Sequence, residues 1–458
     1  MISTTMSLAL AAHACGAAAA LLVILIAYAR ARRLFRRGKR VVAFLHPHCA
    51  AGGGGERVLW VGLVALREAT DARIVVYTGD VGVGAAAMRA RAADRFGVTV
   101  PADVEFVYVR SRRLSEPGLY PVATMIGQSL GSMVLAAEAV LRLPPDVFVD
   151  TTGYGFSFPV VKVLAGARTA AYVHYPTISG DMIGALGTRA FNNRGLALAL
   201  PKLKALYYEL FAVAYGWCGR RCDAVMANSS WTRGHIEKIW RRDDVALAYP
   251  PCDTSVLEKI AKGRPGDSGG PVVVASLAQF RPEKDHALQL EAWALLPEAT
   301  RRRARLVVAG AARHADDRAL LEGLRRRARG LGISDSVEFM VSAPRSEILD
   351  LLRGARVGLH TMRLEHFGIA VVEFMAAGLV PLAHASGGPL LDIVGADGDR
   401  GLVATDAPDY AAKLAALVDG PRETRDAMAA NARAFVADRF SDAAFSAAFV
   451  AGLAGVLP

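Results

Sequence analysis

The sequence predicts an α/β protein built of two domains behind an N-terminal transmembrane helix. At 458 residues the chain is too long for one small core, and its length suits two α/β domains. Short apolar runs of strand length alternate with longer runs of helical periodicity, as in parallel-sheet folds. Hydrophobic residues make up 53% of the chain, a high share for a soluble protein, so a membrane segment is expected.

Residues 8–29 form the predicted membrane segment, because they are apolar apart from His13 and number about 20, the length that spans a bilayer. Residues 30–40 then carry seven Arg or Lys and no acid, so the positive-inside rule places the rest of the chain in the cytosol. A cleaved signal peptide is the alternative, but its charges would precede the apolar run. Seven of the eleven net positive charges lie in this run, which favours an anionic membrane surface as partner and no nucleic acid.

The N-terminal domain is predicted over residues 41–253, after the anchor of residues 1–40. Its strands are expected at 41–45, 73–77, 104–108, 147–150, 169–174 and 223–228. The first strand ends in the loop HPHCAAGGGGERVLW, whose glycines Gly52 to Gly55 let the backbone approach a ligand, with a helix beginning near Glu56. The loop lacks the Lys-Ser/Thr of a P-loop, so it predicts phosphate or sugar recognition without ATP hydrolysis. A flexible loop without a ligand is the alternative.

Two further features of this domain bear on function. His174 is expected at the carboxyl end of a strand, where open α/β sheets place ligand contacts, although a structural histidine is the alternative. The stretches 110–137 and 182–219 mix basic, aromatic and apolar residues, among them Arg189 and Arg194. They are either interfacial helices on a membrane or amphipathic core helices.

The C-terminal domain is predicted over residues 254–435, and a last helix at 440–457 lies within the segment 436–458 expected to cross back to the first domain. Its strands are expected at 272–277, 306–309, 337–341, 356–360 and 380–384. The loop AQFRPEKDH places Arg281 and Lys284 just before a helix that begins near Ala287. Two cations beside a helix start suit a diphosphate leaving group, although they could also be solvated surface charges.

The stretch 356–388 holds the strongest signal for function. It reads as strand, polar loop, helix 369–377 and strand, with Glu365 in the loop and Glu373 two turns inside the helix. A helix N-terminus favours an anionic ligand, and two nearby carboxylates suit sugar hydroxyls. The pattern therefore predicts a nucleotide-sugar site. Taken singly, either acid could be a helix cap or a solvated residue.

The residues EHFGIAVVE followed by SGGP resemble the retaining glycosyltransferases of family four, whose GT-B fold pairs two Rossmann-like domains. The segments YVHYPTISGDM, NSSWT, YPPCD and QFRPEKDH add to this resemblance. They are similar to the enzymes of the family that extend dolichyl-diphosphate-linked oligosaccharide with α-1,2-mannose from GDP-mannose on the cytosolic face of the endoplasmic reticulum. The resemblance implies the partners GDP-mannose, the dolichyl-diphosphate-linked oligosaccharide, membrane lipid and other mannosyltransferases of that pathway, and no cofactor.

The resemblance also implies roles for single residues. Glu365 would hold the mannose, Glu373 the ribose, and Lys284 with Arg281 would neutralise the diphosphate. His174 would lie on the acceptor side of the sugar. The remaining donor-binding residues implied are Phe367, Gly368, Ile369, Gly54 and Gly55. Here the chain departs from the family pattern, because its arginine comes two residues later than usual, which leaves the contact between Arg281 and the diphosphate open.

The resemblance implies metal-independent chemistry, in which cations and backbone amides take the place of a metal. Retention would come from attack on the face that the diphosphate leaves, with the departing phosphate taking the acceptor proton. Glu365 acting as a nucleophile is the competing mechanism. Two alternatives for the whole protein stay open, namely a family-four enzyme that transfers another sugar to a lipid, and a catalytically silent nucleotide-sugar-binding scaffold.

Overall fold

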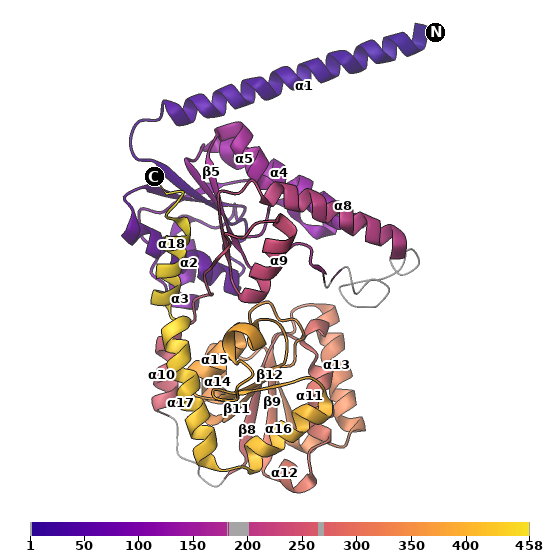
Figure 1. Cartoon of the computed structure of the whole chain (residues 1–458), viewed down its shortest axis with the longest axis vertical. Coiled ribbons are helices and arrows are strands. Elements are labelled where there is room, and N and C mark those ends of the chain that lie inside the picture. The colour runs from indigo at the N-terminus through magenta and orange to yellow at the C-terminus, as the bar shows by residue number, and fades with distance from the viewer. Residues whose placement is uncertain (1, 181, 183–200, 264–269, 458) are drawn as a thin grey trace. The chain divides into compact units, whose positions relative to one another are not determined.

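The computed structural model describes residues 2–180, 182, 201–263 and 270–457, with side chains from residue 17 onward except that of residue 201. Its contacts divide the chain into two units, each with one parallel sheet covered by helices on both faces (Figure 1). The first unit comprises Met1–Asn228, Thr232–Ala248 and Ser446–Pro458, and the second Ser229–Trp231 and Tyr249–Phe445. Two Rossmann-like domains are therefore confirmed. The division falls at Ala248, where the sequence suggests residue 253.

The first unit holds a seven-stranded sheet in the order β3-β2-β1-β4-β5-β6-β7. Its strands are β1 Val41–Leu45, β2 Arg73–Thr78, β3 Glu105–Tyr108, β4 Val147–Asp150, β5 Arg168–Val173, β6 Ala224–Ala227 and β7 Ala246–Leu247. The strand order reverses between β1 and β4, which pair with Val42 beside Val147. Because ligands bind at the carboxyl ends of strands at such a reversal, the loops after β1 and β4 mark the end of this sheet that can bind.

Helices cover both faces of this sheet because successive strand residues point to opposite sides. The helices of the unit are α1 Ile2–Leu34, α2 Gly54–Ala69, α3 Ala85–Phe96, α4 Thr124–Arg142, α5 Ser157–Ala165, α8 Pro201–Gly219, α9 Ser230–Trp240 and α18 Asp442–Leu453. On one face, α4, α5 and α8 bury Leu135, Val161 and Phe211 in a core with Val41 (Figure 1). On the other, Phe449 of α18 stacks on Phe44. The predicted stretch 110–137 contains two short 3-10 turns, Ser111–Ser115 and Pro117–Leu119, before α4.

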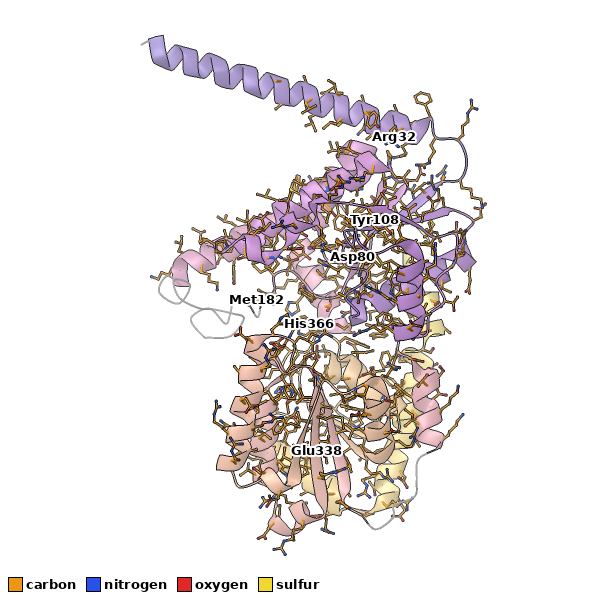
Figure 2. All side chains as sticks on the ribbon, turned by 180° about the vertical axis from the view of Figure 1, so that it is seen from behind. Arg32, Asp80, Tyr108, Met182, Glu338 and His366 are labelled. Atoms are coloured by element: carbon orange, nitrogen blue, oxygen red, sulfur yellow. The ribbon has the colours of Figure 1, made fainter. Side chains whose placement is uncertain are left out.

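The end of α1 is fastened to this unit by arginines. Arg30 and Arg33 donate to the carbonyls of Val163 and Ala165 at the end of α5, at 3.1 and 2.6 Å. Arg32 donates at 2.8 Å to the Leu141 carbonyl of α4 (Figure 2). Carbonyls in the last turn of a helix lack intrahelical partners and carry the negative end of the helix dipole, so guanidinium groups bind there well.

Arg36 completes this attachment, because it donates to the Pro144 carbonyl at 2.6 Å and forms an ion pair with Asp146. The same carboxylate accepts the amide of Val41, the first residue of β1, at 2.8 Å. Four of the seven predicted juxtamembrane charges therefore donate hydrogen bonds to protein groups. We define Arg30, Arg32, Arg33 and Arg36 as the arginine bracket.

One helix among the described residues, α4, meets the length and apolarity needed to cross a membrane, and 39% of its apolar window is buried. Burial of this extent is expected of a helix that covers one face of a sheet. The backbone of α1 includes the predicted anchor, residues 8–29, and Figure 1 shows its N-terminal part extending beyond the rest of its unit. Arg189 and Arg194 lie outside the described residues.

The second unit holds a six-stranded sheet in the order β10-β9-β8-β11-β12-β13. Its strands are β8 Val272–Leu277, β9 Ala304–Gly310, β10 Val337–Val341, β11 Val357–Leu359, β12 Val380–His384 and β13 Leu402–Ala404. Its helices are α10 Thr254–Lys262, α11 His286–Ala294, α12 Glu298–Arg302, α13 Ala315–Gly330, α14 Arg345–Gly354, α15 Ile369–Ala376, α16 Ala407–Asp419 and α17 Arg422–Arg439.

Alternating strand residues divide the interior of this unit into two cores. Leu306 and Val308 pack against α11, α13 and α16, whereas Val307 and Ala309 pack against α10, α14, α15 and α17. Period-two alternation in a sheet buried on both faces produces this division. The strand order reverses between β8 and β11, so the loops after these two strands flank the second possible ligand site.

Candidate functional site

The loops after β8 and β11 bring Lys284 and Glu365 together in the second unit. Lys284 ends a short 3-10 turn, Pro282–Lys284, and its carbonyl accepts the Thr361 hydroxyl at 2.9 Å. Its ammonium group reaches Oε2 of Glu365 at 2.5 Å. The sequence separation of 81 residues is closed by the parallel pairing of β8 with β11. Of the predicted donor residues, these two form a direct contact.

Glu365 stays ionised across the physiological pH range. Burial alone would raise the pKa of this carboxyl, but the hydrogen bond from His360 and the charge of Lys284 outweigh burial and hold its pKa well below the usual range. A carboxylate of this kind accepts hydrogen bonds from hydroxyl groups and cannot act as a general acid near neutral pH.

The segment after β12 holds the backbone of Glu365 in place. Gly388 donates its amide to the Glu365 carbonyl at 2.8 Å, and the Ser386 hydroxyl accepts the Leu364 amide at 2.9 Å. A Cβ on Gly387 would meet the Glu365 carbonyl oxygen at 2.4 Å, so only glycine fits there. The Gly388 amide is therefore occupied by the Glu365 carbonyl and is not available to a ligand.

The other predicted donor residues lie around α15. Gly368 has φ +108° and caps the start of the helix, while Ile369 is its first residue. Glu373 is half-buried further along the helix. Phe367 is a core residue, 4% exposed and stacked on Tyr249 with ring centroids 6.0 Å apart. Its side chain is therefore closed to a ligand, and the prediction that it binds the donor is wrong for the side chain.

Arg281 does not join the pair that Lys284 makes with Glu365. Its side chain is exposed and makes no hydrogen bond to any described residue. It lies two residues after the position at which the family pattern expects it. Its contact with a diphosphate stays a prediction.

The first unit brings its predicted residues together at the reversal point of its own sheet. His174 is the first residue after β5, and the position of a Cβ on Gly55 would lie 3.4 Å from its Nε2. Gly54 begins α2, two residues earlier than expected. The adjacent carboxyl of Glu56 caps that helix through the amide of Gly53. The glycine-rich loop and His174 are therefore neighbours.

Thr151, the residue after β4, fixes which ring nitrogen carries the hydrogen in two histidines. Its hydroxyl donates to the Leu45 carbonyl at 3.2 Å, so it accepts from Nδ1 of His46 at 2.8 Å. Its backbone holds the ring of His174 by a hydrogen bond, and Nε2 of His174 is buried without a partner among the described residues. Burial lowers the pKa of His174 to about 4, against the smaller raising effect of that bond. His174 is therefore neutral near pH 7, with Nε2 as the acceptor.

Comparisons with known proteins agree across both units. Residues 39–240 match the family described as ALG11 mannosyltransferase N-terminus, and residues 259–435 match glycosyl transferases group 1. The GDP-Man:Man(3)GlcNAc(2)-PP-Dol alpha-1,2-mannosyltransferase of Homo sapiens is 43% identical over 91% of this chain and 87% of its own length. The protein of the same name from Dictyostelium discoideum is 38% identical over 89% of this chain and 83% of its own. The chain belongs to this mannosyltransferase family.

Solved structures support the fold of this mannosyltransferase family member. Anabaena Alr3699/HepE in complex with UDP superposes with a TM-score of 0.62 at 17% identity, over 91% of this chain and all of that one. The lipopolysaccharide glycosyltransferase WaaG superposes with a TM-score of 0.58 at 16% identity, over 90% and 99% of the two chains. The predicted GT-B class is confirmed. At these identities the likeness concerns the fold alone.

Sequence reasoning missed His360 in this mannosyltransferase. His360 follows β11 directly, and its Nε2 lies 3.2 Å from Oε2 of Glu365. The signal that singled out His174, a histidine at the carboxyl end of a strand, was also present here. No group of three metal-ligating side chains comes together among the residues that the structure describes.

Proposed function

We propose that this chain transfers mannose from GDP-mannose, with retention, to the Man3GlcNAc2 oligosaccharide on dolichyl diphosphate. The linkage formed is α-1,2, and two successive additions give Man5GlcNAc2. The observation that carries the proposal is the 43% identity with the named human enzyme across nine-tenths of the chain. The contact of Lys284 with Glu365 supports it, because it places a cation and a hydroxyl acceptor at the ligand-binding end of the second sheet.

The arrangement assigns a task to each group. Glu365 accepts hydrogen bonds from mannose hydroxyls. Lys284, which carries three N–H donors, gives one to Glu365 and one to Sδ of Met362, and the third is left for the departing diphosphate. The N-terminus of α15 stabilises the same negative charge. In the first unit, neutral His174 lies on the acceptor side of the sugar. Glu373 binds the ribose.

The ionisation of Glu365 supports attack from the face that the diphosphate leaves. A carboxylate that an ion pair and a histidine hold at low pKa is a weak nucleophile, and Lys284 occupies one of its oxygens. The departing phosphate then takes the acceptor proton. No protein group among those assigned needs to become covalently bound.

We also propose that the chain acts on the cytosolic face of the endoplasmic reticulum membrane, with α1 as its single transmembrane anchor. Exposed apolar side chains continue from α1 onto neighbouring helices of the same unit. Those on α1 are Leu21, Leu22, Val23, Ile24 and Tyr28, those on α4 are Ile126, Leu130 and Val134, and those on α8 are Leu203, Leu206, Leu210, Val213 and Trp217.

The spacing on α8 shows why a membrane suits this surface. Its exposed residues recur every three or four positions, so they form one apolar row along the helix. The opposite side buries Tyr208, Phe211 and Tyr215 in the core. α8 thus has one apolar face buried in the core and a second apolar face exposed on the surface. Contact with the membrane interface explains why the second face is apolar. Partners among other mannosyltransferases stay a prediction from the resemblance.

Transfer from radiolabelled GDP-mannose to synthetic Man3GlcNAc2-diphosphodolichol tests the proposed reaction, with UDP-sugars as competing donors. We expect two additions that an α-1,2-mannosidase removes. Glu365→Ala and Lys284→Ala should each lower turnover at least a hundredfold, as loss of a charge-stabilising group at a reacting centre does. Glu347→Ala and Lys259→Ala, exposed residues of the same unit, are matched controls.

Transfer from a UDP-sugar in place of GDP-mannose would show instead a related enzyme with another donor. Folded protein that binds GDP-mannose but transfers nothing would support the scaffold alternative. Either result would contradict the proposed function.

A further inference from the structure

His360 is a buried histidine to which the proposed function gives no task. Its side chain is 5% exposed, and its Nε2 lies 3.2 Å from Oε2 of Glu365, the oxygen that also accepts Lys284. The residue follows β11 directly and opens the loop that carries Glu365, but its backbone is paired with the neighbouring strand β12.

The backbone of His360 is fixed on both sides. Its amide donates to the Leu382 carbonyl of β12 at 2.9 Å, and its carbonyl accepts the hydroxyl of Tyr410 at 2.9 Å. Tyr410 itself is fully buried on α16. The sheet and a core tyrosine therefore set the position of the imidazole, independently of the loop at residues 361–368.

The position of the hydrogen on the His360 ring defines what the imidazole does. An ionised carboxylate only accepts, so Nε2 of His360 carries the hydrogen in its contact with Glu365. Nδ1 of His360 is buried without a partner among the described residues, which leaves Glu365 as the acceptor that the ring serves. Oε2 of Glu365 thus receives two donors, while Oε1 accepts no hydrogen bond from the described part of the chain.

We propose that His360 is a positioning residue, which fixes Oε2 of Glu365 so that Oε1 faces a hydroxyl of the donor sugar. The inference rests on the proposed function and extends it to the sugar end of the donor. Lys284 alone would hold the carboxylate by a flexible chain of four methylenes, whereas a second donor from a rigid strand end fixes its rotation. Orientation of this kind acts on the bound sugar and not on the nucleotide.

Substitutions that keep or remove the hydrogen at Nε2 test the proposal. In His360→Gln the amide nitrogen reaches about the position of Nε2, whereas in His360→Asn it stops near that of Nδ1. We expect H360Q to keep kcat/KM for GDP-mannose within about threefold of wild type. H360N and H360L should lower it by about tenfold to a hundredfold, as loss of a hydrogen bond to a charged group does.

The inhibition constant of free GDP separates positioning from damage to the fold. GDP carries no mannose, so all three variants should bind it as wild type does. H360N should also add no further loss of GDP-mannose affinity in a Glu365→Ala background, because the two residues act as one unit.

Three results would overturn the proposal. They are wild-type transfer by H360L, an H360Q variant as impaired as H360L, and additive losses in the double variant. If wild-type protein transferred no mannose, the proposed function would fail, and calorimetric GDP-mannose binding by the same variants would still decide the role of His360.

Discussion

Gly387 shows at the level of single residues how tightly Glu365 is held. Its φ of +63° lies in the left-handed region, and a Cβ there would meet the Glu365 carbonyl oxygen at 2.4 Å and its amide nitrogen at 2.9 Å. Both contacts are to backbone atoms, which a change of rotamer cannot relieve. The loop that carries Glu365 is therefore packed against a position where only glycine fits.

We predict that Gly387→Ala lowers transfer at least tenfold, because the added methyl group displaces Glu365, and that it lowers the free energy of unfolding by about 1–3 kcal/mol. Gly398→Ala is the matched control, since Gly398 also has positive φ (+81°) but nothing lies within 4 Å of its Cβ position. Thermal unfolding and transfer assays on both variants measure the difference. If both variants lost the same amount of transfer activity and stability, backbone strain alone would explain the losses, and displacement of Glu365 would not be needed.

The neutral state of His174 makes the stability of the first unit depend on pH. Its folded pKa of about 4 lies below the ordinary value of 6.5, so between these values the unfolded chain binds more protons than the folded one. The stabilisation is complete above pH 6.5 and is lost as the pH falls toward 4. At its limit the loss is about 3 kcal/mol.

We therefore expect His174→Gln to lose less stability than wild type between pH 7 and pH 4.5. Thermal unfolding of the full chain in detergent at several pH values measures this difference. Identical pH profiles would show that protonation of His174 is not coupled to folding. The effect of the same variant on transfer at pH 7 reports separately on the proposed sugar contact.

At the scale of elements, the arginine bracket turns the end of α1 into a fixed attachment. It binds the ends of α4 and α5, so the orientation of α1 is coupled to the sheet that these helices cover. We predict that Arg33→Ala with Arg36→Ala lowers the melting temperature of the first unit, with about 1–3 kcal/mol lost per charge-assisted bond. Arg37→Ala is the control, because Arg37 is exposed. An unchanged melting temperature in the double variant would show that the contacts do not hold the helix.

The exposed apolar residues of α8 lead to a prediction about transfer to an acceptor that lies in a membrane. Leu206→Asp with Leu210→Asp should lower transfer to dolichyl acceptor embedded in vesicles by about tenfold or more, because each burial of a leucine in lipid contributes about 1.5–3 kcal/mol. Transfer to a short, water-soluble acceptor in detergent should stay unchanged. Leu295→Asp, a similarly exposed leucine of the second unit, is the control. Equal loss with both acceptors would indicate damage to the fold and not to membrane contact.

At the scale of the whole molecule, the sequence predicted both sheets apart from their edge strands β7 and β13, and it singled out Lys284 and Glu365, which the structure brings into contact. Buried strands are short apolar runs, and strand-end residues in a parallel sheet meet at one edge. Residues whose role depends on packing could not be predicted. Phe367 is buried because it packs on Tyr249, which lies far away in the sequence. The Gly388 amide is occupied because tertiary packing brings it to the Glu365 carbonyl. The contacts of the arginine bracket could not be predicted either, because the number of charges in a segment does not show which backbone carbonyls lie near them.

The last residues of the chain also bear on how the protein is made. Phe449 and Leu453 of α18 are fully buried, and Phe449 packs on Phe44 of β1, four hundred residues earlier in the sequence. The first unit cannot close its core until the ribosome has released α18. During synthesis the part of the sheet that α18 covers stays exposed while the second unit folds. Truncation at the C-terminus would therefore damage the N-terminal fold first.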